Sequence, residues 1–413
     1  MIAPTTDPRL PAPHQNANYR HLIWDVVWFG LAAQAIWRFL GVYAVRIGMT
    51  PIELGLLSSL PSVAFMVAAS LSTWWRRKYR DSVHAMFWPS LLARLKFLLP
   101  AFTPFFPPEW QPFWLITTAA LTSLPDGVAS TIFVVLLRES VHIDRLATLV
   151  SRRNIALNIG LAISALALGF WLKEAPFPGN YQVMFAVSFV FVLLSLREVM
   201  HVRVPESVPP SAQTATTVSP WRSPFFHRVA AVAILMHLPV FFLAAIFNLR
   251  LIDEMGADEA FMSILALVEL AAGALVSAFA DRLIKRLGNL AVIALIMVGM
   301  SASALIVALS PSLALALVSA AIGGAAWALG GIGLFGYFTQ ITPAEDMTRY
   351  STAYHQVIFL SVFVAPLLGS ALVNAGMSLA GTIFVGGVLR LAGGGLVGWL
   401  GGLARRQVRG DGG

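Results

Sequence analysis

The sequence contains no cysteine and few charged residues, and both shortages restrict what the protein can be. Of its 413 residues, 12% are charged and 58% are hydrophobic, whereas charged residues make up about a quarter of an average soluble domain. Without cysteine, the chain cannot form a disulfide, a thiol nucleophile or a cysteine-ligated metal site. The composition therefore predicts an integral membrane protein whose main partner is the lipid bilayer.

Histidine is also scarce where a membrane-bound cofactor would need it. Only His237 and His355 lie away from the very ends of the apolar segments and could be inside the membrane, and two histidines are too few to ligate the haem groups of a polytopic oxidase. The sequence also lacks an Asp-rich motif of the kind that holds a metal and a phosphate. We therefore expect no cofactor, no metal and no enzymatic activity, and a polytopic membrane enzyme is the least favoured alternative.

Apolar runs of about twenty residues, the length that crosses a bilayer, recur along the whole chain. Twelve runs can be counted, near residues 22–43, 54–74, 83–106, 112–137, 154–172, 181–196, 229–249, 260–280, 290–309, 313–338, 351–373 and 379–400. They predict an all-α polytopic membrane protein with twelve transmembrane helices. The expected parts are a disordered tail (1–21), a six-helix bundle (22–196), a linker (197–228), a second six-helix bundle (229–400) and a second tail (401–413).

Basic residues are distributed unevenly between the two ends of these spans. With the N-terminus placed inside, cytoplasmic segments hold 21 of the 28 lysines and arginines, and outer loops hold only Arg46, Lys173 and Arg250. Because loops rich in Lys and Arg stay in the cytoplasm, both termini are predicted to be cytoplasmic, in a plasma membrane of the bacterial inner-membrane type. This topology accounts for the net charge of +8, so no nucleic-acid partner is expected.

One pattern occurs in both halves of the chain. Asp258 and Glu259 precede an apolar run that ends in the basic stretch 281–288, and a similar layout begins at Glu53, 206 residues earlier, and ends in the basic stretch 76–80. An acidic start, about twenty apolar residues and a basic end predict a membrane helix that stops at the cytoplasmic surface. The repetition of this pattern predicts two related halves.

The second copy resembles a signature of the major facilitator superfamily of secondary transporters, roughly Gly-x-x-x-Asp-Arg-x-Gly-Arg-Arg. Asp281-Arg282 matches the central pair, Ser277 replaces the first glycine, and the basic pair is displaced to Lys285-Arg286. In the first copy Trp75 stands in place of the aspartate. The resemblance implies two pseudo-symmetric six-helix bundles, with the substrate bound near the bilayer midplane between them.

The resemblance also implies a function. It predicts a monomeric secondary active transporter that moves a small organic solute by alternating access and uses protons for coupling. A lipid flippase or scramblase built on the same fold is an alternative, and the sequence leaves the substrate and the direction of transport open. The resemblance further predicts a cytoplasmic gate formed by Asp281, Arg282, Arg76, Arg145 and Arg349, although these charges could instead serve only to orient the chain.

Asp126 is the strongest candidate for a functional charge inside the membrane. Thr118, Thr122, Asp126 and Ser130 recur every four residues, which places them along one side of a helix, and Pro125 with Gly127 should bend or loosen that helix. A charged side chain at the bilayer centre costs about 2.5–3.5 kcal/mol, so it needs a partner or a role. We predict a cavity-facing, proton-coupling carboxylate, with a structural ion pair to Arg94 or Arg38 as the alternative.

Other polar residues inside the predicted spans complete the candidate site. Arg38 and Gln34 share a face of the first span, and Arg38 could neutralise Asp126 or hold an anionic substrate. Glu269 lies mid-span, where a carboxylate taken out of water holds a proton more readily. Arg94 and Arg390 are predicted to be structural charges. The remaining candidates for substrate contact are His237, Asn248 and Trp327.

Overall fold

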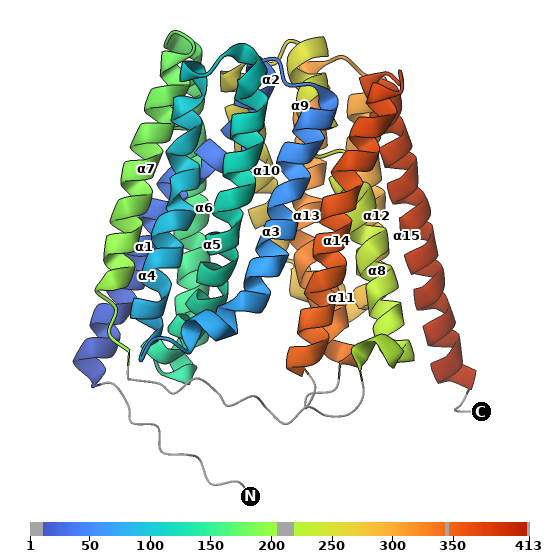
Figure 1. Cartoon of the computed structure of the whole chain (residues 1–413). Helices are drawn as coiled ribbons and strands as arrows, with labels where there is room; N and C mark the ends of the chain where they lie inside the picture. Colours follow the sequence, from blue (N-terminus) through green and yellow to red (C-terminus); the bar gives the residue numbers. More distant parts are fainter. Residues whose placement is uncertain (1–10, 205–218, 343–346, 411–413) are drawn as a thin grey trace, which may run out of the picture. The chain divides into compact units, whose positions relative to one another are not determined.

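The computed structural model describes residues 11–204, 219–342 and 347–410, and these form helices joined by short turns (Figure 1). The helices group into two compact units. Unit 1 contains residues 1–40 and 63–213, and unit 2 contains residues 41–62 and 214–413. The first two predicted spans are therefore divided, because the end of the first and the start of the second pack with the C-terminal half of the chain.

Unit 1 is built around a long N-terminal helix. Its helices are α1 (Ala12–Trp37), the second part of α3 (Pro51–Arg76), α4 (Ser82–Arg94), α5 (Gln111–Ser140), α6 (Ile143–Glu174) and α7 (Gly179–Met200). Helix α1 packs against α6 and α7, and α4 packs against α5. Gly30 and Gly160 make the α1–α6 approach possible, because a Cβ added at Gly160 would lie 3.1 Å from Gly30 Cα.

The third predicted span, 83–106, is not a continuous helix. Helix α4 ends at Arg94 and is followed by the 3-10 turns η1 (Leu95–Phe97) and η2 (Leu99–Phe105), with a third, η3 (Pro108–Trp110), before α5. Pro100 and Pro104 lack the amide hydrogen that a continuing α-helix requires, which explains the change in winding. In the described part of the chain, eleven helices are long and apolar enough to cross a membrane.

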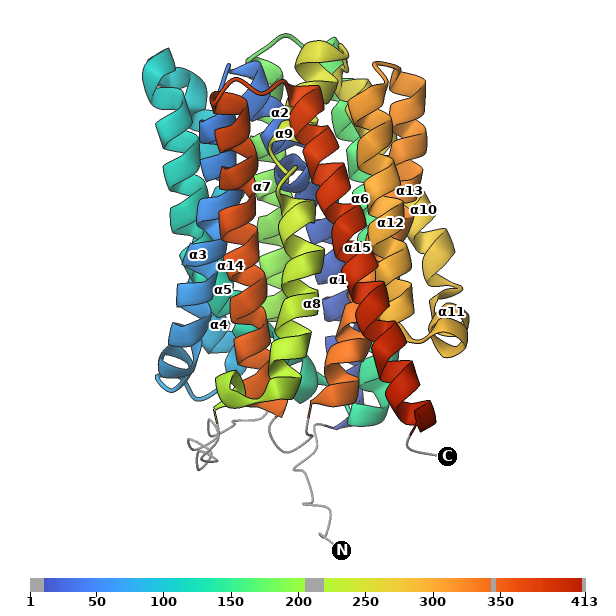
Figure 2. The same ribbon diagram turned by 90° about the vertical axis from the view of Figure 1, so that its right-hand side faces the viewer.

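Unit 2 begins at Gly41, within α2 (Phe39–Arg46), and includes the part of α3 before residue 63. It continues with η4 (Pro220–Arg222), α8 (Pro224–Phe241), α9 (Ile246–Leu249), the π-helix η5 (Arg250–Glu254), α10 (Glu259–Ser277), α11 (Ala280–Leu287), α12 (Asn289–Leu309), α13 (Leu313–Ile341), α14 (Met347–Asn374) and α15 (Leu379–Gly410). Helix α12 packs against α13 and α15, and α8 packs against α14 and α15 (Figure 2).

Both predicted tails are shorter than expected. Helix α1 begins at Ala12, so the prediction of disorder was wrong for residues 12–21, and α15 continues as a helix to Gly410, into the predicted tail. The α1 start is favoured by Pro13, which is compatible with the first turn of a helix. The middle of the predicted linker, residues 205–218, lies outside the described residues.

The repeated acidic starts of the two halves have different structural roles. Thr50 and Glu53 form a capping box at the start of α3, in which the Glu53 carboxylate accepts hydrogen bonds from the Thr50 amide at 2.7 Å and its hydroxyl at 2.8 Å. Asp258 caps α10 by accepting from the Phe261 amide at 2.7 Å. Glu259 instead binds Arg46, with Arg46 Nε 2.9 Å from Glu259 Oε1.

Candidate functional site

The central polar feature of unit 1 is an ion pair between η1 and α5. Lys96 Nζ lies 2.8 Å from Asp126 Oδ2, and the two side chains keep 19% and 30% of their surface exposed. Lys96 reaches Asp126 because α4 gives way to 3-10 turns directly after Arg94. The alternative for Asp126 named Arg94 or Arg38 as the partner, whereas the ion pair that the structure describes is with Lys96.

The hydroxyl groups that precede Asp126 on α5 are bonded within the helix itself. Thr118 and Thr122 are each 5% exposed. Their hydroxyls donate to carbonyls one turn earlier, Thr118 to Trp114 O at 2.8 Å and Thr122 to Thr118 O at 2.7 Å. Only Ser130, at the far end of the stripe, is exposed. The ion-paired acid, rather than the whole stripe, therefore provides the accessible polar chemistry.

Helix α5 is continuous through Pro125 and Gly127, although these residues were expected to bend or loosen it. Gly127 serves close packing instead: a Cβ at this position would lie 2.7 Å from the Phe65 carbonyl oxygen and 2.9 Å from Ala68 Cβ, both on α3. Asp126 thus lies next to Gly127, the residue at which α5 packs closely against α3.

Arg94 belongs to a second, buried network that crosses unit 1. Its guanidinium donates to Val192 O at 2.6 Å and to Ser195 Oγ at 3.0 Å. Ser195 in turn donates to Asp25 Oδ1 at 2.7 Å, and Arg153 binds the other Asp25 oxygen at 2.9 Å. Arg94 was predicted to pair with an acid, and it reaches Asp25 through the Ser195 hydroxyl. This chain of contacts joins α1, α4, α6 and α7, which supports a structural role for Arg94.

Gln34 and Arg38 lie where the first span is interrupted. Helix α1 ends at Trp37, and the Arg38 amide donates to Gln34 O at 3.1 Å as the helix is capped. Gln34 is 5% exposed, and Arg38 is half-buried. The two residues share one helical turn as predicted, but Arg38 stands between α1 and α2 rather than inside a continuous helix.

In unit 2, His237 and Trp327 meet the same phenylalanine. The His237 ring stacks on Phe241 at 6.2 Å between centroids, and Trp327 packs edge-on against Phe241 at 6.0 Å. His237 is 9% exposed, and its Nδ1 lies 2.9 Å from Ala233 O, whereas Trp327 is 46% exposed. Trp327 is therefore the exposed member of the group formed by His237, Phe241 and Trp327.

Asn248 and His237 lie on different helices, His237 on α8 and Asn248 on α9. Helix α8 contains Pro239 and ends at Phe241, and the chain passes through turns before α9 begins at Ile246. Asn248 instead packs against Gly41, where a Cβ would lie 2.7 Å from Asn248 Nδ2.

Arg390 is held by backbone carbonyls. It is 8% exposed and donates to Pro239 O at 3.1 Å, Val240 O at 3.1 Å and Met300 O at 2.9 Å. The carbonyls of Pro239 and Val240 lie at the end of α8, where the regular helical hydrogen bonding stops, and Val240 O also accepts from the Leu243 amide at 3.4 Å. Arg390 donates hydrogen bonds to both carbonyls at the break in α8, which agrees with its predicted structural role.

Glu269 lies on α10 at its closest approach to α13. A Cβ at Gly324 would come within 2.6 Å of Glu269 Cα, so only glycine fits there. The Glu269 side chain is half-buried and makes a further contact in the structure. In the described part of the chain, no three His, Asp or Glu side chains are placed together to hold a metal ion.

The predicted cytoplasmic gate is described only in part. Arg76 is buried and donates to Ser82 Oγ at 3.2 Å and Tyr79 O at 2.8 Å, while Ser82 donates to Glu139 Oε2 at 2.6 Å. Arg282 is exposed on α11. The side chains of Asp281 and Arg349 lie outside the described residues. The gate therefore stays a prediction.

The family model of the Major Facilitator Superfamily matches residues 26–366, which is most of the chain. The chain belongs to the Major Facilitator Superfamily. It is accordingly a secondary active transporter of small solutes that works by alternating access, and its fold is the all-α polytopic fold of that superfamily. No curated relative matches by sequence comparison.

Solved structures of Major Facilitator Superfamily transporters share this fold at low identity. A nucleoside transporter, NupG, is 13% identical with a TM-score of 0.70, over 93% of this chain and 98% of that one. A bacterial homologue of the human lysosomal transporter Spinster, inward-facing and occupied, is 14% identical with a TM-score of 0.65, over 94% and 95%. The xylose transporter XylE from E. coli, inward open, is 12% identical with a TM-score of 0.67, over 94% and 95%.

Two residues at the centre of these networks were not predicted from the sequence. Lys96 is the ion-pair partner of Asp126. Asp25 is 5% exposed and completes the Arg94 network through Ser195. One available signal was that two basic residues, Arg94 and Lys96, lie beside the prolines of the third span.

Proposed function

We propose that the chain is a proton-coupled transporter of a small polar organic solute and that Asp126 is its coupling carboxylate. The observation that carries the proposal is the Lys96–Asp126 pair. It lies within a predicted membrane span, and both side chains remain partly exposed. By contrast, Asp25 is held by Arg153 and Ser195 and is nearly inaccessible. An acid that exchanges protons needs access to water, so Asp126 is the better candidate.

The proposed chemistry is an exchange of partners. When Asp126 takes up a proton, it loses the negative charge that holds the Lys96 ammonium group. Lys96 is then available for a polar group of the solute, and proton release restores the ion pair. The protonated state and the ion-paired state differ in charge. Protonation can therefore favour one conformation of the transporter over another, and proton coupling requires such a bias.

The substrate class is proposed from chemistry and from the neighbours' names. Similar folds are described as a nucleoside transporter and a D-xylose–proton symporter, and both substrates are small, polar and rich in hydroxyl groups. The aromatic group ending in Trp327 would suit the stacking of a base or a sugar ring. Gln34, Arg38, Glu269, His237 and Asn248 are proposed as further substrate or coupling contacts.

Four other features belong to the same proposal. The transporter would act as a monomer in a bacterial inner membrane, with both termini in the cytoplasm. Asp281, Arg282, Arg76, Arg145 and Arg349 would form its cytoplasmic gate. The charge distribution supports the proposed orientation, and the match of Asp281-Arg282 to the family signature supports the proposed gate.

A double-mutant cycle on the ion pair tests the coupling role. Purified protein is first screened by thermal shift with nucleosides and pentoses, and uptake of a stabilising compound is then measured in proteoliposomes with and without a pH gradient. Asp126→Asn should abolish the response to the gradient. The double variant Asp126→Asn, Lys96→Gln should recover thermal stability, because neither charge is left unpaired, but should remain uncoupled.

The Asp25–Arg153 pair provides the matched control. Asp25→Asn should lower the free energy of unfolding by about 3–5 kcal/mol, as expected for a broken buried pair, while the folded fraction keeps its response to the pH gradient. If the Asp126, Lys96 double variant transports with an unchanged pH response, Asp126 is a structural residue and the proposed coupling role is wrong.

A further inference from the structure

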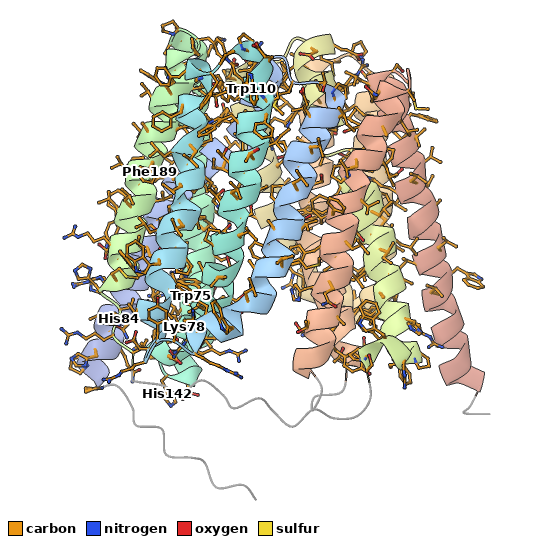
Figure 3. All side chains as sticks on the ribbon, in the orientation of Figure 1. Trp75, Lys78, His84, Trp110, His142 and Phe189 are labelled. Atoms are coloured by element: carbon orange, nitrogen blue, oxygen red, sulfur yellow. The ribbon has the colours of Figure 1, made fainter. Side chains whose placement is uncertain are left out.

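A pocket opens between the starts of α1 and α6, away from the Lys96–Asp126 pair. Its volume is about 320 Å³, many times the space of one water molecule. It lies at the end of unit 1 that carries His142, which Figure 3 labels and whose amide donates to Gln15 Oε1, from the start of α1, at 3.2 Å. The lining residues are Asn16, Tyr19, Arg20, Asp144, Arg145, Thr148 and Arg152.

The pocket carries an excess of positive charge. It is lined by three arginines and a single acid, Asp144. The Asp144 carboxylate is itself engaged, with one oxygen 3.0 Å from His142 Nδ1. Among the described residues, Arg20 and Arg152 form no ion pair, and Arg145 donates to Asn16 Oδ1 at 2.8 Å. Three guanidinium groups without a carboxylate partner form a site for an anion.

Tyr19 gives the site a fixed centre. The guanidinium carbons of Arg145 and Arg152 lie 5.4 Å and 5.8 Å from the centre of the Tyr19 ring, so the ring orients both side chains. The Tyr19 hydroxyl is buried and has no hydrogen-bond partner. A buried hydroxyl without a partner is costly, and a ligand oxygen placed among the arginines would satisfy it.

The surface next to the pocket points to lipid. Trp24, one turn beyond Arg20 on α1, is 48% exposed, and tryptophan favours the level of the lipid headgroups. On α6, Ile155 and Ile159 follow Arg152 by three and seven residues and are 58% and 56% exposed. An apolar strip therefore leads from the arginines along α6, on a helix long and apolar enough to cross the membrane.

We propose that this pocket binds a phosphate group, and that the phosphate is the headgroup of an anionic phospholipid rather than a soluble ion. The arginines would hold the phosphate oxygens in paired hydrogen bonds, the Tyr19 hydroxyl would donate to one of them, and the acyl chains would lie along Ile155 and Ile159. Basic pockets at the cytoplasmic ends of membrane helices are suited to such lipids.

Lipid binding by the full-length protein tests the proposal. Protein purified in a neutral detergent is titrated with phosphatidylglycerol and, separately, with zwitterionic phosphatidylcholine, and bound lipid is counted by native mass spectrometry. We expect phosphatidylglycerol to bind in preference. Arg20→Gln and Arg152→Gln should each weaken its binding about fivefold, and Tyr19→Phe should weaken it without changing the charge.

Arg197→Gln is the matched control, because Arg197 is an exposed arginine at the C-terminal end of α7 that does not line the pocket. This variant should bind phosphatidylglycerol as the unchanged protein does. Equal losses for Arg197→Gln and Arg20→Gln would indicate general charge attraction and would overturn the proposed site. Displacement of the lipid by millimolar inorganic phosphate would reassign the pocket to a soluble phosphate. Phosphatidylglycerol binding that is unchanged in all of these variants would overturn the proposed lipid site.

Discussion

At the scale of single residues, three basic residues inside the predicted spans have three different kinds of partner. Lys96 neutralises Asp126 directly, Arg94 reaches Asp25 through the Ser195 hydroxyl, and Arg390 donates to backbone carbonyls. An unpaired charge in a membrane costs several kcal/mol, so these partners explain why such residues are tolerated. Of these three arrangements, the Lys96–Asp126 pair is the one that combines opposite charges with partial exposure, which separates it from the charges that hold helices together.

Replacing Arg390 tests this distinction. Arg390→Met should lower the free energy of unfolding by about 3 kcal/mol, because three buried carbonyls lose a charged donor. The measurement is thermal or denaturant unfolding of the purified protein. Leu391→Met, an exposed neighbour on the same helix, should change stability by less than about 0.5 kcal/mol. Unchanged stability together with lost transport would instead place Arg390 in the substrate path.

At the scale of helices, proline and glycine decide where α-helix stops and where helices touch. Proline accompanies the change to 3-10 winding after Arg94 and the break after Pro239. Glycine allows α10 and α13 to meet at Glu269. The helix ends and helix contacts set by proline and glycine thereby position the side chains of Lys96, His237 and Glu269.

Two glycines on α13 test the packing argument. Gly324→Ala should destabilise the protein by about 1–3 kcal/mol, because the new methyl group would overlap the Glu269 backbone. At Gly331 an added Cβ would meet nothing within 4 Å, so Gly331→Ala should be neutral or stabilising by up to about 1 kcal/mol through helix propensity. Unfolding of both variants by heat gives the comparison, and equal effects would contradict the close α10–α13 contact.

At the scale of the whole molecule, charge and aromatic residues separate the two ends of the helices. In unit 1, Trp110 lies at one end, and Trp75, Lys78 and His142 lie at the other (Figure 3). The second end is the one predicted to be cytoplasmic from its basic residues, and Lys78 sits over the Trp74 ring there at 3.5 Å. Tryptophan at both ends is the pattern expected at the two membrane–water interfaces.

Cysteine labelling tests the predicted orientation, and the cysteine-free chain provides a clean background. Glu109→Cys, in the predicted external loop, should react with a membrane-impermeant maleimide on intact cells. Arg77→Cys, at the opposite end, should react only after the membrane is opened. Both positions are exposed, so accessibility within the protein does not limit the reaction. The reverse labelling pattern would show that the chain is inserted the other way round.

The sequence by itself determined the membrane class, the approximate spans and the family, because apolar run length, loop charge and the Asp281-Arg282 motif are local features. It also identified Asp126 and Arg390 as charges that need partners. Only the tertiary structure decided which partners they have. Lys96 reaches Asp126 through a change of winding, residues 41–62 pack with the C-terminal half, and the basic pocket joins residues of α1 and α6 that are more than one hundred positions apart. Such pairings depend on how helices pack, and helical periodicity describes only one helix at a time.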